Sequence, residues 1–260
     1  THFLLDFANL TRALPFNRDF RNIPQMSPLE LAAFVDLGYN INFADHFGEA
    51  RYINGNGVQT ATGGFNPTAD YASGIYVQSD NHNLLVNTDI TVNGFAGTGI
   101  RLNGGQEPPP SPTNAMIGNT VEIANGTTVN ANGGFGIGLL VSAGANATLV
   151  HRGTINSTGL GGRGIVLDFS QGTLPFAGSM VGSSDYQAHL VDTLDITGSI
   201  NTLAGLGTAI EIGPAAAVGE VNIMQGAVIG GNIVSNAFSS AGLSRPVLSF
   251  GRTRDANGRA

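Results

Sequence analysis

Several acidic and basic side chains with the potential for acid–base chemistry lie between residues 163 and 195. They are Arg163, Asp168, Asp185, His189, Asp192 and Asp195. Two carboxylates on one face, with a cation or an imidazole beside them, can act as acid and base in the cleavage of a glycosidic bond. The spacing of these residues matches no recognised catalytic pattern. We therefore predict that the chain is not an enzyme, and keep a carbohydrate-active enzyme as the alternative hypothesis.

The remaining candidate sites would hold metal ions. The histidines are His2, His46, His82, His151 and His189, and no two of them fall at metal-ligand spacing. Isolated histidines in a glycine-rich β protein are expected at the surface or in turns. The chain has no cysteine, which excludes a thiolate metal site and a disulfide framework.

A calcium site is a further possibility, because Asp80, Asn81, Asn83 and Asp89 offer clustered oxygen donors. No glycine-rich calcium repeat accompanies them. We favour a polar turn in which asparagines stack on the turns of neighbouring repeats, and predict neither a metal nor a cofactor.

These residues would be positioned by short repeated strands. One phrase places a small residue before aliphatic residues two apart, which is typical of a strand with one buried face. It occurs as Gly74-Ile75-Tyr76-Val77, Gly99-Ile100-Arg101-Leu102, Gly138-Leu139-Leu140-Val141, Gly164-Ile165-Val166-Leu167 and Ala209-Ile210-Glu211-Ile212.

Two further phrases follow in each repeat. The second phrase occurs as Leu84-Leu85-Val86, Val121-Glu122-Ile123, Thr148-Leu149-Val150, Leu194-Asp195-Ile196 and Val221-Asn222-Ile223. The third occurs as Ile90-Thr91-Val92, Thr128-Val129-Asn130, Gly153-Thr154-Ile155, Ser199-Ile200-Asn201 and Ala227-Val228-Ile229.

The spacing of the first phrase indicates a repeat of about 25 residues, with two longer intervals. These intervals contain insertions at about 104–114, which includes a proline run, and at about 172–188. Proline cannot serve a central strand, so we expect both insertions to be loops.

Three short strands in about 25 residues suit one rung of a solenoid, in which rungs stack about 4.8 Å apart. Asn-Gly and Gly-Gly pairs supply the corners, because both residues accept a positive φ at low cost. We predict an all-β fold, a right-handed parallel β-helix of roughly eight rungs over residues 51–260. An antiparallel β-sandwich is the alternative.

Residues 1–50 differ from the repeats and contain one helix signal. Ser27 can cap a helix that begins at Pro28, and Gly38 can end it. Leu31, Phe34 and Val35 would share its apolar face. We expect this segment to be an N-terminal cap of the solenoid, or the tail of an upstream peptidase domain.

Composition excludes several partners. Charged residues make up 11% of the chain, the net charge is −7, and all positive side chains are scattered arginines. The absence of a basic patch argues against nucleic acid and anionic membranes as partners. No apolar run is long enough to cross a bilayer, so we expect no direct membrane insertion.

The repeats over residues 73–233 resemble the passenger domains of bacterial autotransporters, which read as Gly-Ile-x-Val, a polar turn, Leu-x-Asn and Gly-Thr-Ile. The resemblance covers about two thirds of the chain, and pectin-lyase-like enzymes and phage tailspikes use similar rungs. It implies a secreted or surface-displayed protein, anchored through a C-terminal translocator barrel outside this chain.

The opening segment over residues 22–39 resembles the tail of metzincin-like peptidase domains in large bacterial surface proteins. The His-Glu-x-x-His zinc signature and a Met-turn are missing from this chain, so no catalytic residue is carried over.

Together these observations predict a rigid stalk and adhesin whose partner is a protein or glycan on a host or neighbouring cell. The alternatives are a carbohydrate-active β-helix enzyme, the non-catalytic remainder of a surface metallopeptidase, and a purely mechanical spacer.

Overall fold

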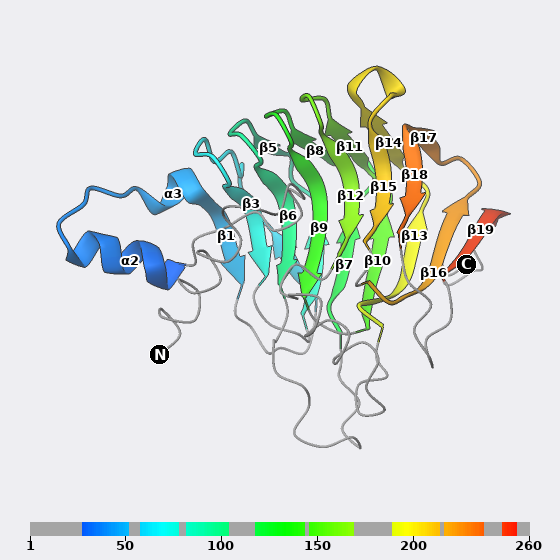
Figure 1. Cartoon of the computed structure of the whole chain (residues 1–260). Helices are drawn as coiled ribbons and strands as arrows, with labels where there is room; N and C mark the ends of the chain where they lie inside the picture. Colours follow the sequence, from blue (N-terminus) through cyan, green and yellow to red (C-terminus); the bar gives the residue numbers. More distant parts are fainter. Residues whose placement is uncertain are drawn as a thin grey trace.

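Strands dominate the computed structural model of the chain. It describes residues 28–51, 58–77, 82–103, 118–143, 146–168, 189–213, 216–236 and 246–253. The strands lie side by side in a regular stack, from the N-terminal end in blue to the C-terminal end in red (Figure 1).

The described strands form three sheets, and every pairing between named strands is parallel. Sheet A contains β1 (Phe47–Arg51), β3 (Ser73–Val77), β6 (Thr98–Asn103), β9 (Ile137–Ala143), β12 (Arg163–Leu167), β15 (Thr208–Ile212) and β18 (Asn232–Ser235). Sheet B contains β2 (Gln59–Ala61), β4 (Asn83–Val86), β7 (Thr120–Ile123), β10 (Ala147–His151), β13 (Val191–Ile196), β16 (Val218–Met224) and β19 (Val247–Arg252). Sheet C contains β5 (Ile90–Val92), β8 (Thr128–Ala131), β11 (Thr154–Ser157), β14 (Ser199–Thr202) and β17 (Val228–Gly230).

The order of the strands along the chain makes the molecule a parallel β-helix. From β3 onward, the chain visits sheets A, B and C in turn, and each strand pairs with the strand three places further on. The predicted parallel β-helix is thus confirmed. Sheets A and B have seven described strands each and sheet C has five, against the roughly eight rungs that we expected.

The three repeated phrases each belong to one sheet. The first phrase forms the five strands from β3 to β15 in sheet A, the second falls in sheet B and the third in sheet C. Equivalent residues also pair in register, as Ile75 with Ile100 and Leu84 with Val121. The self-similarity of the sequence therefore predicted which strands stack on one another.

The core is a set of aliphatic columns that run along the axis of the helix. Buried side chains of one rung lie on those of the next, as with Ile100, Leu139 and Ile165 in sheet A. The small residue that opens the first phrase also faces inward, because a Cβ on Gly74 would lie 2.4 Å from Cγ2 of Ile90. A larger side chain at this corner would displace the sheet C column.

The turns from sheet C to sheet A are short and stack closely. The four turns that lead into β6, β9, β12 and β15 are each closed by a backbone hydrogen bond across three residues, for example from the N–H of Gly136 to the carbonyl of Gly133. A Cβ on Gly133 would lie 1.9 Å from the carbonyl oxygen of Gly94 in the preceding turn. Only glycine permits this approach of two backbones.

Long connections occur at a different corner, between sheet A and sheet B. The predicted insertions at 104–114 and 172–188 lie outside the described residues, and in the chain both follow a sheet A strand and precede a sheet B strand. The first four turns from sheet C to sheet A each contain five residues, whereas the last, between β17 and β18, is Gly231 alone.

The predicted helix is α2 (Pro28–Asp36). It ends in a Schellman motif, in which Gly38 has φ +91° and the N–H of Tyr39 donates to the carbonyl of Phe34. Leu31 is buried and Phe34 is partly buried, but Val35 is 41% exposed, so the apolar face is narrower than predicted. The predicted cap Ser27 lies outside the described residues.

A second short helix, α3 (Phe43–His46), leads into β1 at the N-terminal end of the stack (Figure 1). Strand β1 spans the expected boundary near residue 50. The role of the segment as a cap stays a prediction. None of the described helices has the length and apolar character needed to cross a bilayer.

Candidate binding surface

The predicted acid–base residues lie at several places on two neighbouring rungs. Asp168 follows β12 and is 5% exposed. A Cβ on Gly213 would lie 2.0 Å from its carboxyl carbon, so this side chain packs closely against the next rung. Asp185 lies outside the described residues.

Asp192 and His189 do come together. Asp192 is the extra residue of a β-bulge in β13, because Ala147 pairs with Val191 and Thr148 pairs with Thr193. Its Oδ1 atom lies 3.2 Å from Nδ1 of His189, and the two side chains are 58% and 26% exposed. This pair lies at the surface.

Asp195 and Arg163 each have a different partner. Asp195 is buried on the outward side of β13, where it accepts a 2.9 Å hydrogen bond from Nδ2 of Asn222 on the next rung. Arg163 forms a 3.0 Å ion pair with Glu211, and both side chains are nearly buried. The structure thus engages these two residues in contacts between rungs.

His151 corrects the expectation that the histidines lie at the surface or in turns. It is 1% exposed inside β10, in a column with Ile123 and Ile196. Nε2 lies 2.9 Å from the carbonyl oxygen of Ser199, so Nε2 carries the proton and donates, while Nδ1 has no hydrogen-bond partner. Burial lowers the pKa of the imidazole, and the bond to Ser199 opposes this effect.

The outward side of sheet A is also covered. The column that follows the register Tyr76, Arg101, Leu140 and Val166 points away from the core, yet each of these residues is at most 7% exposed. The Arg101 guanidinium lies 5.6 Å from the centre of the Tyr76 ring. These four side chains are therefore not accessible to a ligand.

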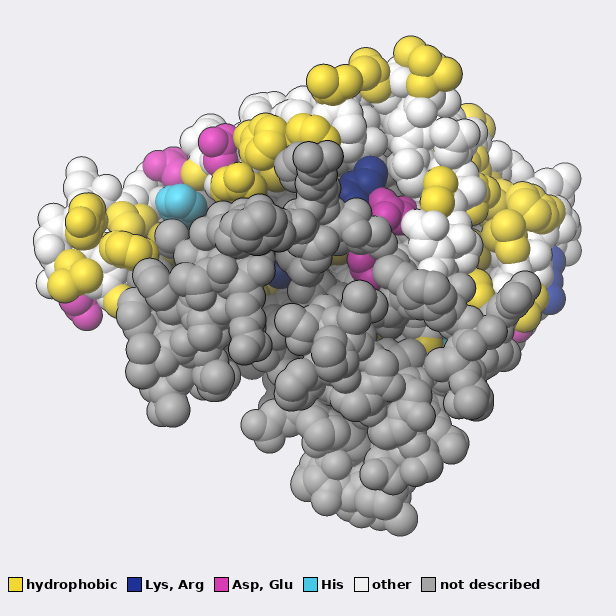
Figure 2. Space-filling model, in the orientation of Figure 1, with side chains coloured by type: hydrophobic (Ala, Val, Ile, Leu, Met, Phe, Trp, Pro, Cys, Tyr) yellow, Lys and Arg dark blue, Asp and Glu magenta, His cyan; other side chains and the backbone are white. Residues whose placement is uncertain are grey.

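By contrast, the turns that lead into the strands of sheet A expose a line of apolar side chains. We call Tyr71, Phe95, Phe135, Leu160 and Leu206 the turn ridge. Ring centres are 5.9 Å apart for Tyr71 and Phe95, and 5.5 Å apart for Phe95 and Phe135. Leu160 and Leu206 are 74% and 82% exposed. Hydrophobic side chains gather along the upper edge in Figure 2, where Figure 1 shows these turns.

Two aromatic rings of the turn ridge, those of Phe95 and Phe135, lie beside glycines of the next turn. A Cβ on Gly161 would lie 2.6 Å from the Phe135 ring, and one on Gly134 would lie 3.6 Å from the Phe95 ring. A large and a small residue exchange places between two adjacent turn positions in three successive rungs, as Phe95-Ala96, Gly134-Phe135 and Leu160-Gly161. The rings therefore fit beside one another.

Two of these rings are held on a strained backbone. Tyr71 has φ +60° and Phe135 has φ +57°, whereas the equivalent turn position holds Ala96 at +50° and Gly161 at +70°. A positive φ costs a residue with a side chain roughly 1–2 kcal/mol relative to glycine. Two aromatic side chains thus occupy positions that glycine fills without strain.

The outward face of sheet C carries a ladder of asparagines. Each asparagine of the ladder donates a hydrogen bond from Nδ2 to the preceding rung. Asn201 donates to Oδ1 of Asn156 over 2.9 Å, and Asn156 donates to Oδ1 of Asn130 over 2.9 Å. Asn130 donates to Oγ1 of Thr91 over 3.2 Å. A second, exposed column at the turns joins Asn132 to Asn93 over 3.0 Å. Stacked asparagines are predicted at the turn around Asp80, where Asp80 and Asn81 lie outside the described residues, so that prediction stays untested.

A column of hydroxyl groups lies beside this asparagine ladder. Thr128, Thr154 and Ser199 pair in register and are partly exposed. The strands of sheet C contain no charged residue. The nearest acids are engaged, because Asp89 accepts from the N–H of Thr128 and Asp70 from the N–H of Phe95, both over 2.8 Å.

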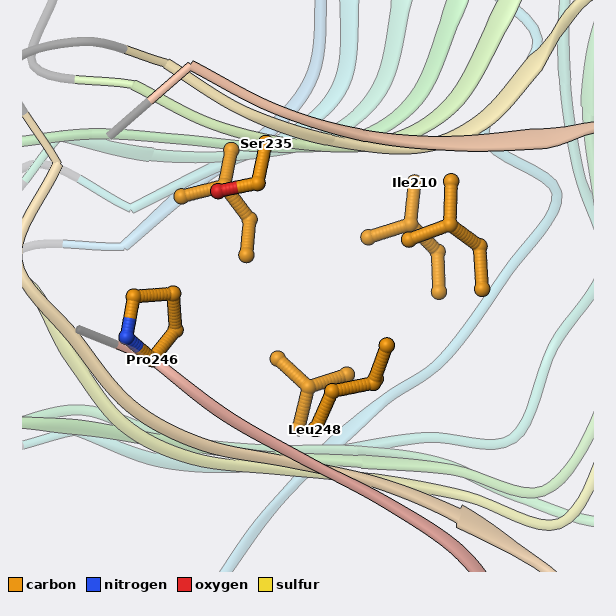
Figure 3. A pocket seen from close by; sticks show the side chains of 7 residues that line it. Ile210, Ser235, Pro246 and Leu248 are labelled. Carbon is orange, nitrogen blue, oxygen red and sulfur yellow. The ribbon is translucent and has the colours of Figure 1, made fainter.

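An apolar pocket of about 430 Å³ lies at the C-terminal end of the helix (Figure 3). It is lined by Ile210, Ile212, Val221, Ile233, Ser235, Pro246 and Leu248. These residues come from the last strands of sheets A and B, so the pocket continues the apolar interior of the solenoid. None of the predicted acid–base residues lines it.

In the described part of the chain, no group of three His, Cys, Asp or Glu side chains could hold a metal ion. Of the residues considered for calcium, Asp80 and Asn81 lie outside that part. No family model matches the chain, and neither a curated protein nor a solved structure matches it.

Proposed function

We propose that this chain is a rigid binding segment of an exported autotransporter-type passenger, displayed at the bacterial cell surface, and that it acts as an adhesin. The observation that carries this proposal is the turn ridge. Its outermost members, Leu160 and Leu206, are mostly exposed on neighbouring rungs. Neighbouring apolar side chains that are exposed on a solvent-facing surface are typical of interaction sites.

The rigidity of the scaffold also favours a binding role. The core columns and the asparagine ladder fix each rung on the next, so the ridge is presented with little conformational freedom. A surface that is already ordered loses less entropy when it binds.

The state of the predicted acid–base residues favours binding over catalysis. Asp195 is buried and bonded to Asn222, and Asp168 is buried against the next rung. Export is supported by the cysteine-free, glycine-rich and asparagine-rich repeats that resemble passenger domains.

Attachment of the chain to cells tests the proposal. Fluorescent beads coated with the purified chain are incubated with cultured epithelial cells and with bacteria, with soluble chain as competitor. We expect saturable attachment that the soluble chain abolishes. Beads that attach no better than albumin-coated beads to either kind of cell would overturn the adhesin function.

A matched pair of variants tests the part played by the ridge. Leu160→Asn with Leu206→Asn alters two exposed turn residues and should reduce attachment at least fivefold, while Val58→Asn, at a residue 61% exposed away from the ridge, should not. Equal attachment of both variants would refute the ridge as the binding site.

A further inference from the structure

The turn ridge and the outward face of sheet C form one surface with a repeated chemistry. Phe95, Phe135, Leu160 and Leu206 lie in turns that directly follow a sheet C strand, and the turn of Tyr71 follows Phe65, which is bridged to Ile90 of sheet C. The ridge therefore lies beside the asparagine and hydroxyl columns. Two successive rungs offer a large apolar turn residue, an amide or hydroxyl at the turn, and an asparagine on the strand, as Phe135, Asn132 and Asn130 and as Leu160, Thr158 and Asn156. The rungs on either side of them offer two of the three features. The repeat distance is that of the rungs, about 4.8 Å.

The asparagine amides retain capacity for a ligand. Each amide group has two N–H donors and two acceptor positions, and the ladder uses one donor and, for Asn130 and Asn156, one acceptor position. The bonds between rungs also fix the orientation of the amides. They are therefore ordered before any ligand binds.

The charge of this surface selects against ionic ligands. The strands of sheet C have no charged side chain, and Asp70 is the charged residue among the described turns that carry the ridge. Arg163 begins the next strand of sheet A, but it is paired with Glu211 and its side chain is 11% exposed. An acidic polymer would find no open cation here.

We propose that this surface binds a neutral linear polysaccharide that lies along the axis of the β-helix, with successive sugar units meeting successive rungs. Aromatic rings offer apolar faces for the C–H faces of sugar rings, while amides and hydroxyls match the sugar hydroxyls. A repeating ligand suits a repeating site, because contacts on each rung add to one another. This inference names the partner class of the proposed adhesin and rests on that function.

Glycine substitutions at the strained turn position provide a clean test. Tyr71→Gly with Phe135→Gly removes two rings at positions where the backbone has a positive φ, so glycine relieves strain and the fold should be retained. Ala96→Gly is the matched control, because it makes the same backbone change at the equivalent position without removing a ring. Circular dichroism verifies the fold of both variants.

Binding is measured by affinity electrophoresis of the whole chain in gels that contain dextran, yeast mannan, a soluble β-glucan or alginate. We expect at least one neutral polymer to retard the chain, and alginate to retard it less. The double variant should bind at least tenfold more weakly, while Ala96→Gly should bind within twofold of the wild type.

The proposal is overturned if no neutral polymer retards the chain, if alginate binds best, or if the double variant binds as well as the control. Attachment to cells separates this result from the proposed function. Cell attachment without polysaccharide binding would leave the adhesin and refute the glycan ligand, in favour of a protein partner. Polysaccharide binding without cell attachment would support the ligand and refute the adhesin.

Discussion

Acidification should weaken the fold through the buried His151. The imidazole lies in a column with Val86, Ile123, Ile196 and Ile223, where a positive charge has no partner. Burial lowers the pKa of the folded imidazole, so the unfolded chain binds more protons once the pH falls below about 6.5. The contribution to stability is therefore present above that pH and is lost as the pH falls.

The loss of stability on acidification is limited because His151 takes up only one proton. Uptake of one proton by the unfolded chain lowers the free energy of unfolding by at most about 1.4 kcal/mol per pH unit, or roughly 2 kcal/mol between pH 6.5 and 5. The pH dependence of unfolding sums over all ionisable groups of the chain, so a variant must isolate the histidine. His151→Ile continues the aliphatic column and removes the titrating group, at the loss of the bond to Ser199.

Urea unfolding followed by circular dichroism at pH 7.5, 6.5, 5.8 and 5.0 makes the comparison. At pH 7.5 we expect the wild type and His151→Ile to differ by no more than about 1 kcal/mol, because added apolar burial offsets the lost hydrogen bond. The difference should then grow in favour of the variant as the pH falls. Ile196→Val, in the same column, should cost about 1 kcal/mol at every pH. Parallel pH curves for the wild type and His151→Ile would refute the reasoning.

Three further predictions test the contacts between rungs. Gly133→Ala should destabilise the chain by about 3 kcal/mol in urea unfolding, because its Cβ would lie 1.9 Å from a backbone oxygen; Gly126→Ala, with φ +83° and open space around it, should cost only about 1 kcal/mol. Asn156→Ala breaks two ladder bonds and should cost about 2 kcal/mol; no measurable loss would mean that the ladder does not stabilise the stack. Glu211→Gln should lower the free energy of unfolding by roughly 3 kcal/mol, because it leaves the nearly buried Arg163 guanidinium without its carboxylate. Adding Arg163→Met to this variant should recover most of the loss. A double variant no more stable than Glu211→Gln would contradict this.

The solenoid could be predicted because the sequence repeats both its glycine and asparagine turns and its alternation of apolar and polar residues. Ile75, Ile100 and Ile165 recur after a small residue, and stacking on like residues follows from that spacing alone. The same alternation also predicts that His151 points inward, because it lies two residues after the inward Leu149 on the same strand. Its polarity favoured a turn, and that inference was wrong because one donor to the Ser199 carbonyl suffices to hold a neutral imidazole inside.

The candidate surface was harder to predict because it depends on which turn residues become neighbours. Phe95 and Phe135 lie at different positions of their turns, and they interlock only when Gly134 and Gly161 are placed beside them. From the sequence alone, the glycines indicate only the corners of the rungs. Likewise, the bulge that exposes Asp192 appears only once the register of β10 and β13 is known.

The direction of the sheet hydrogen bonds determines how the molecule would carry a mechanical load. Strands of neighbouring rungs are joined by bonds that run along the axis, so tension applied between the two ends stretches all rungs in series. Such a structure opens one rung at a time from an end, and each repeat of about 25 residues releases roughly 80 Å of extended chain. Under tension, the protein would lengthen stepwise while its remaining rungs, and the surfaces they present, stay folded.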